Sequence, residues 1–110
     1  MGVYTWDDPA QIDEFESGGQ RRVLGYTDRM MLVHYSLNAG DEGELHSHAD
    51  TVQASYVIDG QLELRGEYDT TVGPGDSYVI PPGTVHSVYA KTSCDVLDAF
   101  SPPLDAYKPE

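Results

Sequence analysis

The chain has 110 residues, 39% of them hydrophobic, which suits one domain built around a single core. Its net charge of −13 argues against nucleic acid or an anionic membrane as a partner. No apolar run approaches the ~18 residues of a membrane span, and the N-terminus lacks the basic and apolar regions of a signal peptide. Cys94 is the only cysteine, so no internal disulfide can form. We therefore expect a cytoplasmic protein without disulfides.

Residues 1–17 are expected to form an N-terminal arm that precedes the main domain. A short strand is predicted over residues 3–6. Asp8 followed by Pro9 is typical of a helix start, with the aspartate as cap and proline in the first turn. The pattern therefore predicts one or two helical turns over residues 9–16, ended by the glycine pair that follows.

From residue 22 onward the sequence predicts β-structure, because short runs rich in β-branched and aromatic residues alternate with turn sequences. Many short strands at even spacing indicate an all-β sandwich or barrel with antiparallel pairing. Residues 104–110 are expected to be a C-terminal tail or short turn. The predicted strands cover residues 22–26, 30–37, 52–58, 61–65, 68–72, 77–80, 86–90 and 96–100.

Side-chain alternation along these strands places polar groups on what we expect to be the inner face. If Gln53 faces inward, so do Ser55 and Val57. In the last strand, Asp98 and Phe100 share one face with a valine. Asp98 is therefore predicted to be a carboxylate held among apolar side chains.

Two histidines, His46 and His48, are two residues apart within residues 40–60. On an extended strand such residues point to the same face, about 7 Å apart, and their imidazoles can converge on one metal ion. Gln53 follows five residues later, and His86 ends a second stretch rich in glycine and proline. Each histidine alone is more simply a hydrogen-bonded core residue. Together they predict a site for one divalent transition metal, such as Ni, Zn, Fe or Mn.

These spacings resemble the two sequence motifs of the cupin family. Residues 40–60 read G-x5-H-x-H-x4-Q-x6-G and resemble the first motif, and residues 75–86 read G-x5-P-x-G-x2-H and resemble the second. The resemblance implies one cupin domain over residues 1–110, a small antiparallel jelly-roll barrel with one bound metal. The ligands it implies are His46, His48, Gln53 and His86. Gln53 stands where the usual motif has Glu, and Ala90 where the second motif usually ends in Asn.

The glutamine has a chemical consequence, because a carboxamide ligand leaves the full charge of the ion in place. Such a site attracts anions, is a stronger Lewis acid and stabilises a trivalent metal less well. The glutamine therefore favours non-redox chemistry on a carbonyl, enolate or carboxylate over chemistry with O₂. A glutamine that only points its amide into the pocket is the simpler alternative.

A closer resemblance covers residues 18–32, 45–60, 75–86 and 95–103, which are similar to the KdgF-type cupins of pectin and alginate degradation. It implies the same ligand set of three histidines and one glutamine. It also implies conversion of a small anionic substrate, a 4,5-unsaturated uronate, into its linear keto form.

The resemblance also assigns roles near the last strand. An Asp and a Phe that line the family's pocket match Asp98 and Phe100, which makes Asp98 the candidate general acid/base and Phe100 a residue that shapes the sugar face. The family's Arg after the Ser-Pro-Pro turn is replaced by Leu104, which cannot bind a carboxylate as an arginine fork does. Arg22 or Arg65 is a candidate to replace that clamp.

Two other functions are open at this point. A cupin dioxygenase would use a redox metal and O₂, and the missing glutamate ligand counts against it. A non-catalytic module would hold a metal or sugar, and Leu104 makes it more credible. An open polar pocket from solvent to His46 and Asp98 would favour an enzyme, whereas a pocket plugged by Tyr and Met side chains would favour the binding module.

The source and the assembly are also predicted. Only two of the six basic residues are lysines, and acid enrichment with few lysines suits a halophilic source as well as a merely acidic cytosolic protein. The cupin resemblance implies a homodimer, in which residues 1–17 would suit a strand exchanged between subunits.

Overall fold

The computed structural model describes residues 2–109, and β-strands dominate it. One turn of 3-10 helix, η1 (Asp105–Tyr107), follows the last strand. Within the described residues no helix is long and apolar enough to cross a membrane. The strands in chain order are β1 (Gln11–Glu14), β2 (Gln20–Tyr26), β3 (Met31–Leu37), β4 (Val52–Asp59), β5 (Leu62–Gly66), β6 (Thr70–Val72), β7 (Ser77–Ile80), β8 (His86–Ala90) and β9 (Cys94–Ser101).

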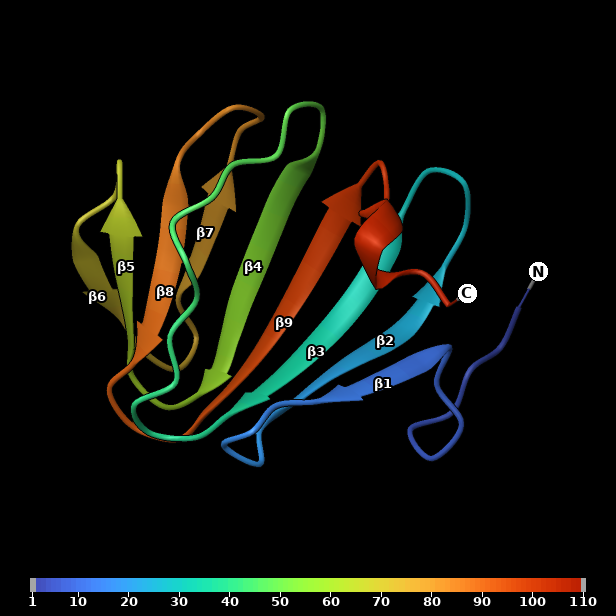
Figure 1. Ribbon diagram of the computed structural model, residues 1–110, viewed down its shortest axis with the longest axis horizontal. Helices are drawn as coiled ribbons and strands as arrows, with labels where there is room; N and C mark the ends of the chain where they lie inside the picture. Colours follow the sequence, from blue (N-terminus) through green and yellow to red (C-terminus); the bar gives the residue numbers. More distant parts are fainter. Residues whose placement is uncertain (1, 110) are drawn as a thin grey trace.

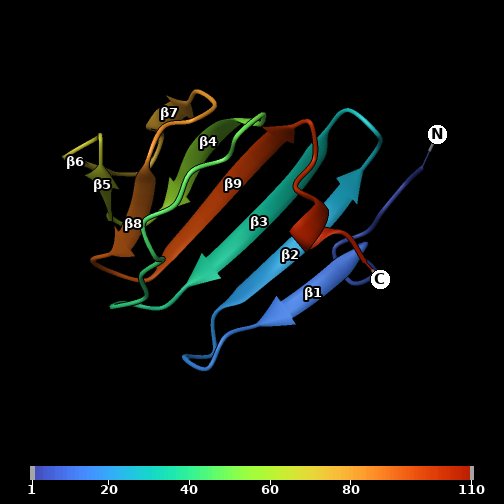
Figure 2. The ribbon, with the colours of Figure 1, turned by 45° about the horizontal axis from the view of Figure 1, so that its top comes forward.

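The strands form two antiparallel sheets that together make a jelly-roll barrel (Figure 1). The larger sheet has the order β1-β2-β3-β9-β4-β7, and the smaller has the order β6-β5-β8. Figure 2 shows β9 lying between β3 and β4, although it comes last in the chain. The predicted fold class is therefore confirmed, but the central pairings join segments that are far apart in the sequence, and only the outer hairpins are local.

The eight strands predicted from residue 22 onward are all present, with ends within two residues of the prediction. Turn chemistry explains this accuracy. Gly60, for example, has φ +90°, and a Cβ there would lie 2.2 Å from the carbonyl oxygen of Ser93. Only glycine fits such a turn, so it separates β4 from β5 reliably.

The N-terminal predictions are wrong. Residues 3–6 form no strand but a turn closed by a bridge between Thr5 and Asp8. Residues 9–16 hold β1 in place of a helix, and β1 pairs with β2 of the same chain. A helix of that length is marginal on its own, whereas pairing at the sheet edge satisfies the backbone groups. Gly18, with φ +93°, turns the hairpin and does not end a helix.

Side-chain alternation on the central strands is as predicted. In β4 the residues Gln53, Ser55 and Val57 are buried while their neighbours are exposed. In β9, Asp98 and Phe100 are buried together with the valine on their face, whereas the residues between them are partly exposed. The inner face of the larger sheet thus carries the polar residues that were predicted to lie there from the sequence.

Candidate metal centre

Three histidines gather on one side of the barrel because two extended segments run side by side. Residues 41–50, between β3 and β4, pass in front of β8 (Figure 1). The backbones of His46 and His86 exchange both hydrogen bonds, at 3.0 and 2.8 Å. The amide of Gly83 donates to the carbonyl of His48 at 2.7 Å. The segment is thus fixed by isolated bridges and makes no continuous strand with β8.

The three imidazoles face one another closely. Their ring centroids are 4.3 Å apart for His46 and His86, 4.9 Å for His46 and His48, and 5.1 Å for His48 and His86. One nitrogen from each ring lies within 4.8 Å of the others. The predicted convergence of the three histidines is therefore confirmed.

Hydrogen bonds fix the tautomers of two of these rings. Nδ1 of His46 lies 2.7 Å from the carbonyl oxygen of Glu44, and Nδ1 of His86 lies 2.9 Å from that of Thr84. A carbonyl only accepts, so each Nδ1 donates its proton and each Nε2 keeps a free lone pair. Nε2 of His86 is buried and has no hydrogen-bond partner among the described residues.

Electrostatics also favour neutral rings. Burial lowers the pKa of His48 and of His86, and the neighbouring His46 lowers both further, although the Thr84 carbonyl opposes this at His86. Neutral imidazole is the form that binds a metal. Unpaired lone pairs, fixed tautomers and mutual proximity together make this cluster suited to a divalent transition metal.

Gln53 lies beside the cluster, on β4, and is 6% exposed. Its side-chain nitrogen donates to Ser55 Oγ at 3.1 Å and to Asp98 Oδ2 at 3.4 Å. Both nitrogen protons are thus directed away from the histidines. The amide oxygen is left as the group available to a metal, which supports the role of a fourth ligand.

Asp98 is the buried acid of the site. It is 5% exposed, and burial raises its pKa to about 7, while a hydrogen bond with Ser55 opposes the rise. Its Oδ2 is engaged by Gln53, whereas Oδ1 has no hydrogen-bond partner in residues 2–109. A carboxyl group with such a pKa and a free oxygen can both take up and release a proton near neutral pH.

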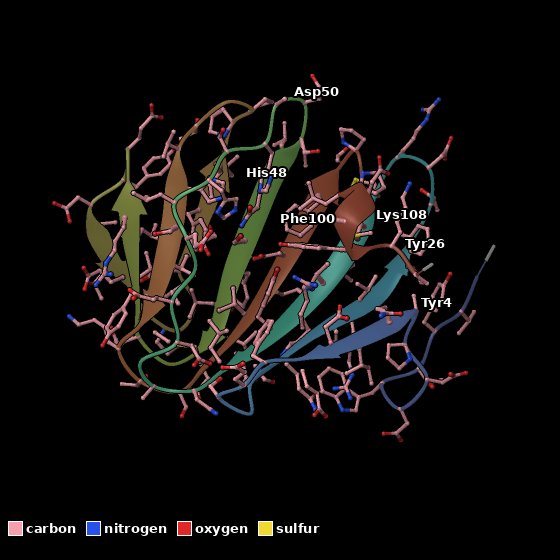
Figure 3. The ribbon with its side chains drawn as sticks, in the orientation of Figure 1. Tyr4, Tyr26, His48, Asp50, Phe100 and Lys108 are labelled. Atoms are coloured by element: carbon pink, nitrogen blue, oxygen red, sulfur yellow. The ribbon has the colours of Figure 1, made fainter. Side chains whose placement is uncertain are left out.

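All these groups line one cavity of about 460 Å³ between the two sheets. Phe100 lies near the C-terminal end of β9, and its ring centroid is 6.1 Å from that of His48. Figure 3 labels both side chains. Tyr35, Tyr78 and Tyr107 also line the walls. His46 is exposed, so the cavity reaches solvent at the histidine cluster.

The two arginines suggested as carboxylate clamps lie elsewhere. Arg22 stacks on Trp6, with its Cζ 3.9 Å from the ring centroid, and Arg65 pairs with Glu42 and Glu63. Neither lines the cavity. Leu104 packs against the apolar cluster around Phe100.

Arg21 is the functional candidate that the sequence prediction missed. It lines the cavity, and it is the only lysine or arginine that does so among the described residues. The signal was available: Val23 is fully buried, and residue 21 shares its face along β2. The predicted strand began at residue 22 and therefore left Arg21 out.

His34 lies outside this site. It is on β3 with its ring against Trp6, at 5.0 Å between centroids, and its Nε2 is 3.4 Å from Asp95. Its ring therefore packs away from the cavity, whose lining residues do not include it.

Comparisons with known proteins agree with this geometry. The model of the family described as "Cupin domain" matches residues 33–100. The pectin degradation protein KdgF of Dickeya dadantii (strain 3937) is 30% identical over 104 residues, which cover 93% of this chain and 94% of that protein.

Solved structures are similar over almost the whole chain. The structure of KdgF from Halomonas sp. is 28% identical with a TM-score of 0.85, and the match covers 96% of this chain and 97% of the other. An RmlC-like cupin from Shewanella frigidimarina NCIMB 400 is 26% identical with a TM-score of 0.86, over 97% of this chain and 96% of the other.

Proposed function

This chain belongs to the cupin family, in the group of KdgF-type cupins, and on that premise we propose that it is a metal-dependent enzyme that linearises an unsaturated uronate. The observation that carries the proposal is the shared cavity. It joins a cluster of three histidines whose nitrogens are close enough to hold one metal to a buried carboxyl group with one free oxygen. Its volume of about 460 Å³ is within the range of small-molecule sites.

The metal would be held by His46, His48, His86 and the amide oxygen of Gln53. All four are neutral ligands, so a divalent ion bound there would supply an undiminished positive charge and Lewis acidity towards substrate oxygens. The candidate metals are Ni, Zn, Fe and Mn, and elemental analysis of the purified protein distinguishes them.

Asp98 would move the proton. The substrate has a C4=C5 double bond and a hemiacetal at C1. Asp98 accepts the proton of the C1 hydroxyl as the bond between C1 and the ring oxygen breaks, which leaves an aldehyde at C1 and an enolate at C5. The same carboxyl group then gives that proton to C4, and C5 becomes a ketone. The reaction is an isomerisation, so no further reactant is needed.

The aromatic residues would shape the sugar site. Phe100 presents an apolar ring close to His48 and Asp98, where it can cover one face of the sugar and exclude water. Tyr35 and Tyr78 are partly buried, and burial raises the pKa of both phenols, so they stay neutral. They form a wall that leaves Asp98 as the group that exchanges protons.

The alternatives are less well supported. A cavity that reaches solvent at His46 favours an enzyme over a non-catalytic module, whose pocket would be plugged by Tyr and Met side chains. The Gln53 amide, oriented by Ser55 and Asp98, favours Lewis-acid chemistry over a dioxygenase that cycles to a trivalent metal.

Three further predictions concern the setting of the protein: a homodimer, a cytoplasmic location and a halophilic source. Sedimentation velocity at low and high salt checks the first. A mass of twice 12.1 kDa would support the dimer, and a single copy at all concentrations would contradict it.

The test of the proposed reaction follows the ultraviolet absorbance of the C4=C5 double bond, which is conjugated with the carboxylate. We expect metal-loaded protein to remove this absorbance from a 4,5-unsaturated galacturonate much faster than it decays alone. Chelator-treated protein is the control and should approach the spontaneous rate. A spontaneous rate with fully metal-loaded protein would overturn the proposal.

A further inference from the structure

We propose that Arg21 binds the carboxylate of the substrate and selects uronates over neutral sugars. This inference rests on the proposed function, since it names the group that recognises the acid of a uronate. It assigns to β2 a task that Leu104, an apolar residue after β9, cannot perform.

The charge of the cavity shows why such a residue is needed. The whole chain carries −13, and the carboxyl groups of Asp41, Glu42 and Asp98 line the cavity. A cationic side chain would act together with the metal proposed at the histidines to offset the repulsion between these walls and an anionic sugar. Within the described part of the chain, Arg21 is the only lysine or arginine on those walls.

Arg21 is held in place from two sides. Its Nη2 donates to Asp13 Oδ2 on β1 at 3.1 Å. Its Cζ lies 3.9 Å from the centre of the Tyr107 ring, which η1 brings over the sheet. Such stacking fixes the plane of a guanidinium and leaves its edge free for hydrogen bonds. The side chain is therefore preorganised before any ligand arrives.

The guanidinium also has unused donors. Its side chain is 20% exposed, and its Nε is buried without a hydrogen-bond partner in residues 2–109. An arginine has five N–H donors; Asp13 accepts from one of them, and the Tyr35 hydroxyl is a second partner, which leaves further donors unused. The fork can therefore accept a carboxylate, which it binds with two parallel hydrogen bonds.

The position of Arg21 suits a substrate that also reaches Asp98. Arg21 pairs with Tyr35 on β3, and Tyr35 pairs with Val96 on β9, two residues from Asp98. Two strand spacings across the sheet and two residues along β9 place the two Cα atoms about 12 Å apart. The long arginine side chain shortens this gap, so one monosaccharide can lie between the guanidinium and the acid.

The test measures ligand preference separately from turnover. Binding of D-galacturonate and of D-galactose, which differ in the carboxylate, is measured by isothermal titration calorimetry on zinc-loaded protein. The variants are Arg21→Gln, Arg21→Lys and the matched control Arg22→Gln. Arg22 is the next residue on the same strand, but it stacks on Trp6 outside the cavity.

We expect the wild-type protein and Arg22→Gln to prefer galacturonate, and Arg21→Gln to bind it roughly 10- to 100-fold more weakly, as loss of charged hydrogen bonds predicts. Galactose binding should not change. Arg21→Lys keeps the charge and the Asp13 contact and should give an intermediate loss. If Arg21→Gln does not fold, Arg21→Lys is the variant that tests the inference.

Two results would overturn the inference: an undiminished preference for galacturonate in the Arg21 variants, or no preference in the wild-type protein. Either can occur whether or not the absorbance assay shows turnover. If the protein shows no turnover but still prefers galacturonate, and this preference depends on Arg21, the proposed reaction is wrong and the carboxylate site is supported.

Discussion

The cavity has two ends that are built in different ways. The histidine end comes from two short segments, residues 46–48 and the start of β8, which backbone hydrogen bonds hold side by side. The arginine end draws on β1, β2, β3 and the C-terminal η1, through Asp13, Arg21, Tyr35 and Tyr107. The histidine end therefore needs one contact between two short segments, whereas the arginine end depends on the pairing of the whole larger sheet.

The two ends also differ in charge. Burial lowers the pKa of His48 and of His86, which keeps these two rings neutral and prepares them for a metal. Arg21 is permanently charged and already oriented by Asp13. Asp98 lies on the sheet between them, as the only one of these groups whose pKa is raised to near neutrality. This difference separates metal binding, substrate recognition and proton transfer into groups that single substitutions can test.

The largest expected effect comes from Asp98. Asp98→Asn keeps the size of the side chain but removes the proton carrier, so kcat should fall by about 10²- to 10⁴-fold. The metal content should not change, because both proposed ends of the site remain. Full activity in this variant, measured by the absorbance assay, would show that Asp98 is no acid or base in this reaction.

The histidine end can be broken separately. His86→Ala removes one ring of the cluster, and we expect metal affinity to fall by more than the 10- to 100-fold that even outer-shell changes cost. His34→Ala is the control, since that ring packs on Trp6 away from the cavity. Competition with a chromogenic chelator gives both affinities. Similar affinities for the two variants would contradict the assignment.

A pH effect sharpens the position of Asp98. Its pKa is 3.8 in an ordinary setting and about 7 in the folded chain. Between these values the folded state holds more protons than the unfolded state, so this contribution to stability is lost as pH rises. From pH 5 to pH 8 the loss is about 3 kcal/mol.

Urea unfolding of metal-free wild type and Asp98→Asn at the two pH values measures this loss. The lowered pKa values of His48 and His86 give an opposite slope below about pH 6.5 in both proteins, so the difference between the proteins isolates Asp98. We expect the wild type to lose stability relative to the variant. A difference independent of pH would contradict the buried, protonated acid.

The smallest expected effect is at Asp13, which only orients Arg21. The ion pair is partly exposed, and such pairs contribute about 0.2 to 1 kcal/mol. Asp13→Asn should therefore weaken galacturonate binding by no more than about fivefold. Isothermal titration calorimetry of Asp13→Asn and Arg21→Gln under the same conditions shows which variant loses more affinity for galacturonate. A larger loss at Asp13 than at Arg21 would show that the roles are reversed.

The sequence predicted the histidine end and the strands because both follow from local spacing. His46, His48 and Gln53 lie within one short stretch, and glycine turns such as Gly60 mark where strands end. Alternation along β9 was enough to place Asp98 and Phe100 inside.

The N-terminus and the arginine end could not be predicted in the same way. Asp8-Pro9 is typical of a helix start, but residues 11–14 pair with β2 at the edge of the sheet and form β1. The predicted strand omitted the first two residues of β2, and Arg21 is one of them. Its stacking on Tyr107 depends on the C-terminal segment packing against β2. These features follow from pairing between distant segments, which no local pattern records.

The most direct measurement of the central claim is the metal content of protein purified without a nickel column. Mass spectrometry of the intact chain and elemental analysis should find one divalent transition metal per chain in the wild type. The triple variant with alanine at His46, His48 and His86 should contain none. No metal in the wild type after reconstitution, or equal metal in the triple variant, would contradict the account.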